Sequence, residues 1–298
     1  MQSQQKQPSL TYSPLPQYQI VRFSGPDAAS FLQGQLSADV VKLSEQGSFA
    51  AHCNVKGRMI SSFYIKRINN DYLIRVHREI SDIAIAALKK YMLFSKVTLS
   101  VETELNCIAF KGEQLQERLE RELELTSECW HMLNEECAEL WIDKSAEQQL
   151  VNKLQAQTED TEFWPLVLLQ EGLAELREGQ SEEFLPQELN YDLIGAVNFK
   201  KGCYTGQEVI ARLHYRGQLK KHLRLASCAP SKLQNKAALI DKDRKKVGAS
   251  VQSYTTKERT WLLCLCNDSS YESNDISIES CDKGLQKVQW HQLPYAIP

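Results

Sequence analysis

The apolar runs of this chain are short, and this feature limits its fold more than any other. The longest are "PLVLL" at residues 165–169 and "WLLCLC" at residues 261–266, whereas a membrane-spanning helix needs about 20 apolar residues in succession. Hydrophobic residues nevertheless make up 42% of the 298 residues, so apolar side chains must be gathered from many short elements. At this length we expect about two or three domains, each with its own core.

Strands and helices are both predicted in the first 160 residues. The segments "YQIVRFSG", "SFYIKRI" and "DYLIRV" read as strands, with a turn at Asn69 and Asn70, and "KVTLSVE" and "ELWID" predict two more. Helical spacing predicts an amphipathic helix from Ile80 to near Phe94 and further helices over residues 113–128 and 145–157. Another short helix is expected from Ser24, which can cap its free amides, while Asp27 three residues later imitates a capping box.

The pattern changes after residue 220. The short strand candidates "LKKHLRLAS", "VGASVQSY" and "RTWLLCLC" follow one another, separated by polar turns. This spacing predicts a small closed or nearly closed β domain. Together with the mixed elements before it, it predicts an α+β fold.

The charge and the cysteine content of the chain limit the possible partners and the cellular location. The net charge of -3 and the pI of about 6.1 give no overall attraction to nucleic acid or to an anionic membrane. Nine cysteines, an odd number scattered along the chain, indicate reduced thiols, and the N-terminus lacks the apolar centre of a secretory signal. We therefore expect a cytoplasmic protein with no membrane partner. No Cys-x-x-Cys pair occurs and Cys264 and Cys266 lie in an apolar strand, so we expect no metal site.

One loop carries the strongest chemical signal, "KKGCYTGQEVIAR" at residues 200–212. Gly202 and Gly206 allow a tight turn. Lys201 and Arg212 supply positive potential near Cys203, and such surroundings favour the thiolate. Cys203 is therefore a candidate reactive thiol; the alternative is a half-buried turn cysteine beside solvated lysines.

The loop begins a basic stretch over residues 200–224, in which Glu208 is the single acid. Its cations are Lys200, Lys201, Arg212, Arg216, Lys220, Lys221 and Arg224. Such a stretch could bind phosphates or carboxylates, or it could be a strand edge kept soluble by its charge. Direct tRNA binding is disfavoured, because no known RNA-binding module is recognisable.

Two aromatic residues leave two interpretations open. Trp164 precedes an apolar run and Tyr18 precedes the first long strand. Such side chains usually belong to the core, but they could also enclose a flat heterocycle. Motifs for nucleotide hydrolysis and serine-esterase chemistry are missing from the sequence.

The loop motif "KGCYTGQE", followed by "VIAR", resembles the YgfZ family, the folate-binding relatives of the glycine-cleavage T protein, an aminomethyltransferase. "FLQGQLSADV", "AAHCNVKGRM", "LKKYMLFSKVT" and "FLPQELNYDLIGAVNF" also resemble YgfZ segments in the same order. The resemblance runs from about residue 18 to 217. It implies a three-domain ring around a central folate cavity, with a C-terminal β-barrel. On this basis we expect domains at residues 1–50 with 158–222, at 51–157 and at 223–298.

The resemblance also implies site residues. Lys201 and Cys203 match the functional motif, and Trp164 matches a tryptophan of the folate site. Tyr18 falls where the best-known member has another tryptophan, and a phenol can stack on a pterin. Around Cys203, the loop would be shaped or braced by Gly202, Tyr204, Gly206, Gln207 and Glu208. Arg212 and the basic stretch would accept the glutamate carboxylates of tetrahydrofolate or a one-carbon derivative.

Function is implied in the same way. Members of the family act in the maturation or repair of iron-sulfur proteins and influence tRNA thiolation through those enzymes. The runner-up is a folate-dependent aminomethyltransferase, but Ser61 and Ser62 stand where the T protein carries two consecutive acids, and a hydroxyl cannot serve as a carboxylate base. A third interpretation is an interaction module that holds folate only as a structural ligand.

Overall fold

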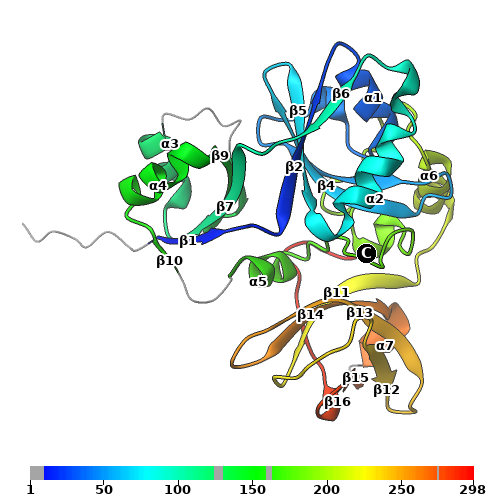
Figure 1. Ribbon diagram of the computed structural model, residues 1–298. Coiled ribbons are helices and arrows are strands. Elements are labelled where there is room, and N and C mark those ends of the chain that lie inside the picture. The colour runs from blue at the N-terminus through cyan, green and yellow to red at the C-terminus, as the bar shows by residue number, and fades with distance from the viewer. Residues whose placement is uncertain (1–9, 124–129, 159–162, 274) are drawn as a thin grey trace, which may run out of the picture.

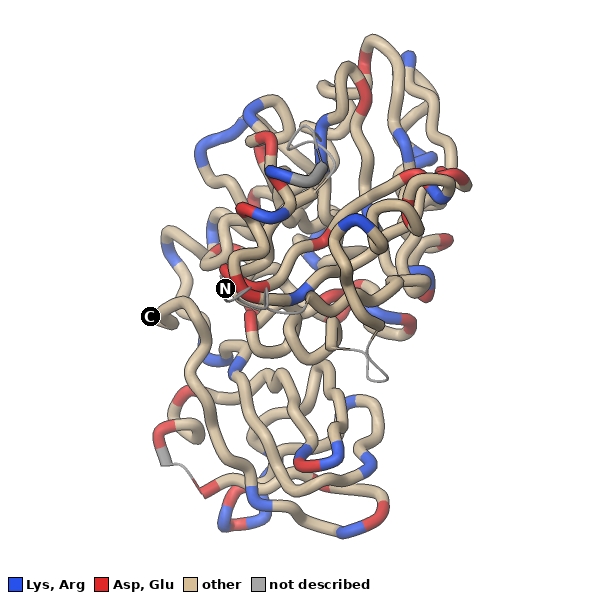
Figure 2. The backbone as a smooth tube through the Cα atoms, turned by 90° about the vertical axis from the view of Figure 1, so that its left-hand side faces the viewer, with Lys and Arg blue, Asp and Glu red and all other residues tan. Residues whose placement is uncertain are grey.

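The computed structural model describes residues 10–123, 130–158, 163–273 and 275–298. Within these ranges the strands form three sheets, and Figure 1 shows each sheet in a lobe of its own, with helix α5 (Phe163–Gln170) close to the place where the lobes meet. Figure 2 shows basic and acidic residues interspersed along the backbone, with no large region of one sign in that view.

The first lobe contains a five-stranded antiparallel sheet of order β3-β4-β5-β2-β6. Its strands are β2 (Tyr18–Ser24), β3 (Ser48–Cys53), β4 (Met59–Ile68), β5 (Asp71–His77) and β6 (Thr98–Val101). Its helices are α1 (Ala28–Gln35), α2 (Arg78–Lys89) and α6 (Gln207–Arg216), with 3-10 turns η1 (Val40–Lys42) and η2 (Met92–Phe94). The predicted strands, the turn at Asn69 and the helix from Ile80 are confirmed.

The second lobe contains the sheet of order β10-β1-β7-β9-β8. Its strands are β1 (Thr11–Pro14), β7 (Leu105–Lys111), β8 (Trp130–Asn134), β9 (Cys137–Asp143) and β10 (Gln157–Thr158). Helices α3 (Leu115–Leu123) and α4 (Lys144–Lys153) contribute Leu115, Leu119 and Leu150 to its core. Both helices were predicted; residues 124–128 of the first prediction lie outside the described residues.

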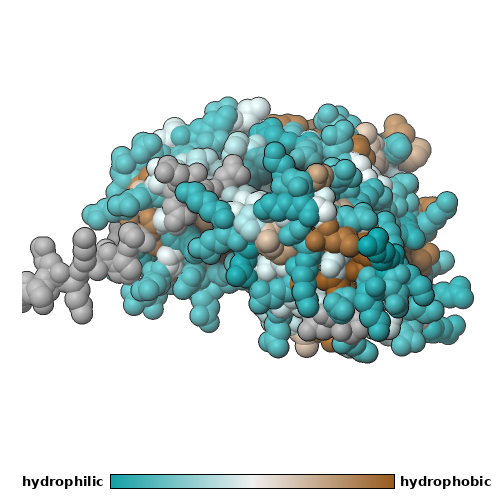
Figure 3. All heavy atoms as spheres, turned by 90° about the horizontal axis from the view of Figure 1, so that it is seen from below, coloured by the Kyte–Doolittle hydropathy of each residue, from teal (hydrophilic) through white to brown (hydrophobic). Residues whose placement is uncertain are grey.

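The third lobe is a curled sheet of seven strands, order β16-β15-β12-β13-β14-β11-β17. The strands are β11 (Lys221–Cys228), β12 (Ala238–Asp241), β13 (Lys246–Thr255), β14 (Thr260–Asn267), β15 (Ile276–Ser280), β16 (Gly284–Lys287) and β17 (Gln289–His291); α7 spans Asp268–Ser273. Each edge strand, β16 and β17, pairs with one neighbour among the described residues, so the sheet is a half-barrel. In Figure 3, which looks onto the molecule from below, hydrophilic side chains cover most of the surface.

The segment between α5 and α6 and the end of the chain hold the lobes together. This segment contains the 3-10 turn η4 (Pro186–Leu189). Near the C-terminus, Tyr295 Oη donates to the carbonyl of Gly172 at 3.0 Å and accepts from Asn190 Nδ2 at 3.3 Å. Figure 1 shows the chain end back at the junction of the lobes. The C-terminal residues therefore pack against the segment that follows α5.

The strands that share a sheet do not follow the domain boundaries expected from the sequence, at residues 1–50 with 158–222 and at 51–157. Strand β3 runs across residue 50, and β4 and β5 pair with β3 and β2. Strand β1 pairs with β7 instead. Backbone hydrogen bonds join these strands into continuous sheets, so the first sheet does not divide at residue 50. The third sheet begins at Lys221, close to the expected start at 223.

The start of α1 also differs from its prediction. The helix begins at Ala28 with Asp27 at the cap position, and the Asp27 side chain caps no amide of its own helix. Its Oδ2 instead accepts from the amide of Lys96 at 2.7 Å. Gly25, at φ +110, turns the chain here. The helix expected from Ser24 is therefore confirmed but begins at Ala28, after a turn in which the Ala28 amide donates to the Gly25 carbonyl at 3.1 Å, and Ser24 does not cap it.

Candidate functional site

The loop that carries Cys203 is fastened to the first lobe by backbone contacts. Asn198 Oδ1 accepts from the amides of Lys200 at 2.8 Å and Lys201 at 3.0 Å, and the Asn198 amide donates to the carbonyl of Ser37 at 2.9 Å. At the other end, the Thr205 amide donates to the Gly34 carbonyl at 3.1 Å. The loop is thereby held against the end of α1.

Lys201 lies beneath this loop, with its ammonium buried. Its Nζ donates to the carbonyls of Gln33, Leu36 and Ala38 at 2.7, 2.6 and 2.8 Å. An ammonium has three protons to donate, and these carbonyls stand at the end of α1, where helical carbonyls lack partners of their own. Burial lowers the pKa of Lys201 to about 8, although the negative charge of Asp39 acts in the opposite direction and raises it. Lys201 therefore fixes the loop to α1; an influence on the Cys203 thiol stays a prediction.

Cys203 itself is exposed, between an exposed glycine and a buried tyrosine. Gly202 has open space around the position of a Cβ, and its φ lies outside the left-handed region. Gly206 differs: its φ is +86, and a Cβ there would stand 2.5 Å from the carbonyl oxygen of Asn54. Both glycines were expected to permit a tight turn. The structure requires a glycine at position 206 but not at position 202.

The remaining loop residues divide into inward and outward positions. Tyr204 is buried, and its amide donates to Gln207 Oε1 at 3.2 Å. Glu208 is exposed in the first turn of α6, and Arg212 is exposed one turn later. Bracing of the loop by Gln207 therefore has a visible contact, whereas Glu208 and Arg212 face solvent.

The other predicted pair, Tyr18 and Trp164, lies in a buried network. Trp164 is fully buried, and its Nε1 donates to Tyr18 Oη at 3.1 Å. Tyr18 Oη donates to Glu175 Oε2 at 2.5 Å, and the Arg75 guanidinium lies 3.9 Å from the centre of the Tyr18 ring. Burial, aided by Glu175, raises the pKa of Tyr18 well above its usual value, so the phenol keeps its proton.

Arg75 joins the lobes through two buried carboxylates. Its Nη1 donates to Glu175 Oε1 at 2.5 Å, and its Nε lies 2.9 Å from Glu139 Oε1 in β9. Burial raises the pKa of Glu139; for Glu175, burial acts in the same direction, but Arg75 and its other partners bring the pKa below the usual value. In the described part of the chain, Arg75 Nη2, Glu139 Oε2 and both ring nitrogens of the buried His131 have no hydrogen-bond partner.

Sequence reasoning missed this network. Its signal was present: Arg75 stands inside "DYLIRVH" and Glu139 inside "CAELWID", each a charged residue in an otherwise apolar strand. Long charged side chains are almost never fully buried unless they are paired. An isolated charge in such a strand therefore indicates a partner from another element.

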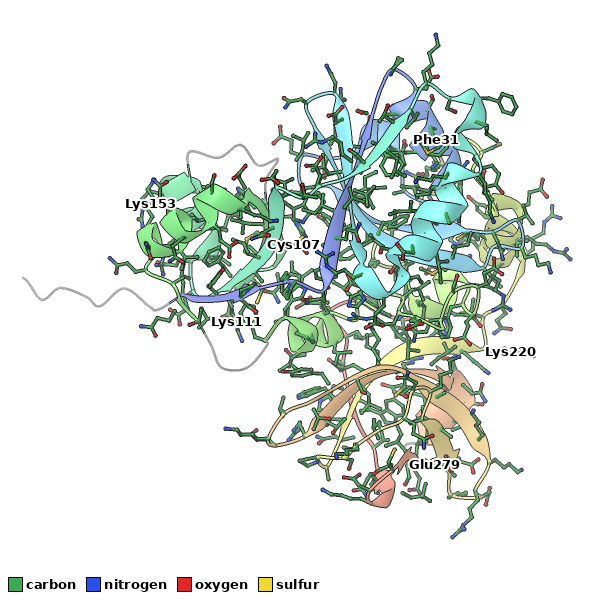
Figure 4. The ribbon with its side chains drawn as sticks, viewed as in Figure 1. Phe31, Cys107, Lys111, Lys153, Lys220 and Glu279 are labelled. Atoms are coloured by element: carbon green, nitrogen blue, oxygen red, sulfur yellow. The ribbon has the colours of Figure 1, made fainter. Side chains whose placement is uncertain are left out.

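Two hollows lie near this network. The larger has a volume of about 700 Å³ and is bounded by α5, the segment 177–180 and β13. Gln252 in its wall accepts from the Glu175 amide at 3.2 Å and donates to the Glu175 carbonyl at 2.8 Å, so the network lies directly behind this wall. The smaller, of about 120 Å³, is lined by Tyr18 and Cys107; Figure 4 shows Cys107 between the first and second lobes.

These dimensions test the expected folate site. Cavities that bind drug-sized ligands usually measure about 300–1,000 Å³, which the larger hollow satisfies and the smaller does not. Tyr18 lines only the smaller hollow, and Trp164 lines neither. The two aromatics therefore do not fit a role as an open stacking pair. Pro165 and Leu168, from the same helix as Trp164, do line the larger hollow. We call this hollow, between α5, residues 177–180 and β13, the junction cleft.

The structure separates the two groups of predicted site residues. Trp164 belongs to α5, at the junction of the lobes, whereas Cys203 precedes α6, which Figure 1 shows at the outer side of the first lobe. We expected the Cys203 sulfur close to a bound folate. Cys203 is exposed and is not among the residues that line the junction cleft.

Comparison with known proteins identifies the family. No family model matches the chain. Curated proteins named "tRNA-modifying protein YgfZ" are 32% identical in Escherichia coli (75% of this chain, 74% of the relative) and 30% identical in Blochmanniella pennsylvanica (90% of each). The relative in Klebsiella pneumoniae is 28% identical over 97% of this chain and 94% of its own length. The chain belongs to the YgfZ family.

A solved structure shares the fold of this YgfZ family member. The glycine cleavage system aminomethyltransferase T from Bartonella henselae aligns with a TM-score of 0.74 at 14% identity, covering 96% of this chain and 86% of that chain. The agreement confirms the fold relationship that the sequence motifs indicated. At this identity it says nothing of shared activity.

Ser61 and Ser62, which the sequence resemblance placed at the positions of two acids in the T protein, are both buried in β4. Ser61 Oγ lies 3.4 Å from Nδ1 of His52, and Ser62 Oγ accepts from the Leu176 amide at 2.8 Å. Neither residue lines the junction cleft or the smaller hollow. In this member of the YgfZ family, the pair therefore makes internal contacts.

The remaining sequence expectations concern metals, thiols and membranes. Among the described residues there is no group of three or more His, Cys, Asp or Glu side chains that could hold a metal ion. All eight described cysteines are free, and Cys264 and Cys266 are buried as expected; Cys129 lies outside the described residues. No helix in the described ranges is long and apolar enough to cross a membrane.

Proposed function

We propose that this protein acts in the cytoplasm as a tetrahydrofolate-binding accessory factor for iron-sulfur enzymes, and affects tRNA thiolation through them. One finding supports a role related to tRNA modification: the relatives are named tRNA-modifying proteins. The folate part of the proposal follows the sequence resemblance, and the fold shared with the aminomethyltransferase T is compatible with it. The observation that carries the proposal is the junction cleft, whose size and polar lining suit a folate.

The lining of the junction cleft offers a partner for each part of the ligand. Leu168 provides apolar surface, and the Gln180 and Gln252 side chains provide amides. Acidic and basic groups also line it, namely Glu79, Glu178, Arg177 and Lys236. Carboxylates accept from the amino and ring N–H groups of a pterin, and cations form charge-assisted hydrogen bonds with glutamate carboxylates. In this proposal Trp164, which belongs to α5, and its hydrogen-bond partner Tyr18 hold the helix in place from the interior and do not stack on the ligand.

The loop around Cys203 is the second part of the proposal. Its thiol is exposed and can therefore meet a partner protein. Asn198 and Lys201 hold the backbone before Cys203, and the Thr205 amide, which donates to the Gly34 carbonyl, holds the backbone after it. We assign Lys201 a positioning role and Cys203 the chemical contact with an iron-sulfur client. When bound, tetrahydrofolate would supply a carrier for one-carbon units. Direct binding to tRNA forms no part of the proposal.

The aminomethyltransferase alternative gains no support from the geometry. Ser61 and Ser62 are buried and carry no charge, so neither can stabilise a cationic one-carbon intermediate by ion pairing. Aminomethyl transfer from a lipoyl carrier by the purified protein would reverse this conclusion.

Calorimetric titration with tetrahydrofolate tests the junction cleft. The wild-type protein should bind, and Arg177→Ala should bind about tenfold more weakly, because one charge-assisted hydrogen bond is lost. Arg67→Ala, at an exposed position of β4 that does not line the cleft, is the matched control and should bind like the wild type. Absence of binding to the folded wild-type protein would contradict the proposal, as would equal affinities for wild type and Arg177→Ala.

A cellular assay tests the link to iron-sulfur enzymes. Cells lacking this protein should show reduced activity of iron-sulfur enzymes and fewer thiolated nucleosides in bulk tRNA, with unchanged tRNA abundance. Normal iron-sulfur activity accompanied by low thiolation would contradict the indirect route and would favour a direct action on tRNA.

A further inference from the structure

A second groove adjoins the junction cleft. It lies on the curled sheet, has a volume of about 680 Å³, and is lined by residues of β12, β13, β15 and β16 and the turns between them. Lys236 lines both hollows. The two hollows therefore adjoin at Lys236, and we call the second one the sheet groove.

The two hollows differ in charge. The junction cleft is lined by two acids, Glu79 and Glu178, and two bases, Arg177 and Lys236. The sheet groove is lined by three bases, Lys236, Arg244 and Lys246, and one acid, Glu279. The electrostatic potential therefore becomes more positive along the path from the cleft into the groove.

The local structure presents these cations to the groove. The turn after β12 is closed by Asp241, whose Oδ1 accepts from the amides of Asp243 at 2.9 Å and Lys245 at 2.8 Å. This carboxylate is thus occupied by the backbone, while Arg244 and Lys246 are exposed. Lys236, on the boundary of the two hollows, forms an ion pair with Glu183 and its side chain is 45% exposed.

We propose that the sheet groove binds the γ-linked polyglutamate tail of a folate whose pterin lies in the junction cleft. The proposal rests on the proposed function. Each added γ-glutamate brings one carboxylate on a short aliphatic stem. Arg244 and Lys246 match the carboxylates, and Leu285, which is 47% exposed in the same groove, matches the stems. Exposed ion pairs contribute little individually, so the effect arises from several acting on one tethered chain.

The direct test compares tetrahydrofolate with one glutamate and with five in calorimetric titrations. The wild-type protein should bind the pentaglutamate about tenfold more tightly, because several weak contacts add up. The double variant Arg244→Gln/Lys246→Gln should bind both forms with the wild-type monoglutamate affinity. The difference in wild type should also shrink when salt is raised, since exposed charges are screened.

A matched control removes two cations from the same lobe outside the groove. Lys232→Gln/Lys257→Gln makes the same change in charge at two exposed positions that line neither hollow. This variant should keep the full preference for the pentaglutamate. If it loses the preference to the same extent as Arg244→Gln/Lys246→Gln, net charge and not the groove is responsible, and the proposal is overturned.

The outcomes separate this inference from the proposed function. Equal binding of both forms by wild type would overturn the tail site while leaving the junction cleft intact. No binding of either form by the folded protein would remove the proposed function and the inference together. Tripolyphosphate should not abolish the preference at concentrations where penta-γ-glutamate does; equal competition by both would make the groove a general polyanion site and overturn the assignment.

Discussion

The Cys203 loop and the junction of the lobes each bury a cation, and they neutralise it in different ways. Lys201 gives all its protons to backbone carbonyls at the end of α1. Arg75 is paired with two carboxylates, Glu139 and Glu175, from other elements. The pKa of Lys201 is lowered by burial, whereas for Arg75 the two carboxylates outweigh burial and raise the pKa.

The difference shows which part of the fold each cation controls. The carbonyl partners lie in the last turn of α1 and in the residues directly after it, so Lys201 orders a local loop beside an exposed thiol. Carboxylate partners come from β9 and from the segment after α5, so Arg75 connects two lobes and the wall of the junction cleft. We therefore expect changes at Arg75 to act on the whole protein and changes at Lys201 to act on the loop.

The largest effect is expected for Arg75→Met. The substitution leaves two carboxylates buried without their cation, and breaking a buried ion pair from one side costs about 3–5 kcal/mol. Urea unfolding followed by circular dichroism measures the loss. Arg67→Met, at an exposed residue of β4, should change stability by less than about 0.5 kcal/mol. Arg75→Lys keeps the charge and should fall in between; a loss below about 1 kcal/mol for Arg75→Met would contradict the account of the junction.

A pH effect of about 3 kcal/mol is expected from His52, which is buried in the lobe of the loop. Burial lowers its pKa from 6.5 to about 4, so the unfolded chain binds more protons between these values, and stability falls as the pH falls from about 6.5 to 4. His52→Gln should have a flatter stability profile over this window than the wild type. Parallel profiles for wild type and His52→Gln would contradict the assignment.

For Lys201→Met, a loss of about 2–3 kcal/mol is expected, because three carbonyls lose a charged donor. Alkylation of Cys203 should also become faster or less selective as the loop loosens, measured by peptide mapping after a short maleimide pulse. Tetrahydrofolate affinity should be unchanged, since Lys201 is not among the residues that line the junction cleft. Lys200→Met, at an exposed neighbour, should affect neither quantity; weakened folate binding in Lys201→Met would break the separation of the two regions.

The smallest effect concerns the two glycines of the loop. Gly206→Ala should cost about 1–2 kcal/mol, because the left-handed conformation is unfavourable with a Cβ and the added atom meets the Asn54 carbonyl. Gly202→Ala has open space and an ordinary φ, so its free energy of unfolding should match that of the wild type. Equal losses at both positions would show that the loop differs from the one described.

The helices and strands could be predicted well from the sequence, whereas the contacts between distant segments could not. Alternation located β4, β5 and the turn at Asn69, because each depends on neighbouring residues. The pairing of β1 with β7 and of β2 with β5 depends on residues far apart in the chain, and for that reason the expected boundary at residue 50 fell inside β3.

The candidate site shows the same limit. The motif drew attention to Lys201 and Cys203, but not to the carbonyls that Lys201 binds, since these come from backbone about 165 residues away. From the sequence, Trp164 and Tyr18 could belong either to the core or to a ligand site, and the structure places both side chains in the interior. Arg177, Lys236 and Gln252 carry no local signal, because only the packing of the third lobe on α5 makes them neighbours.

The central claim is that folate binding at the junction cleft and chemistry at the exposed thiol are separate parts of one function. The most direct measurement is the content of thiolated nucleosides in tRNA from cells in which Cys203→Ala replaces the wild-type protein. The account predicts low thiolation although the purified variant binds tetrahydrofolate with wild-type affinity. Full thiolation with the Cys203→Ala protein would contradict it and leave the folate-holding interaction module as the better description.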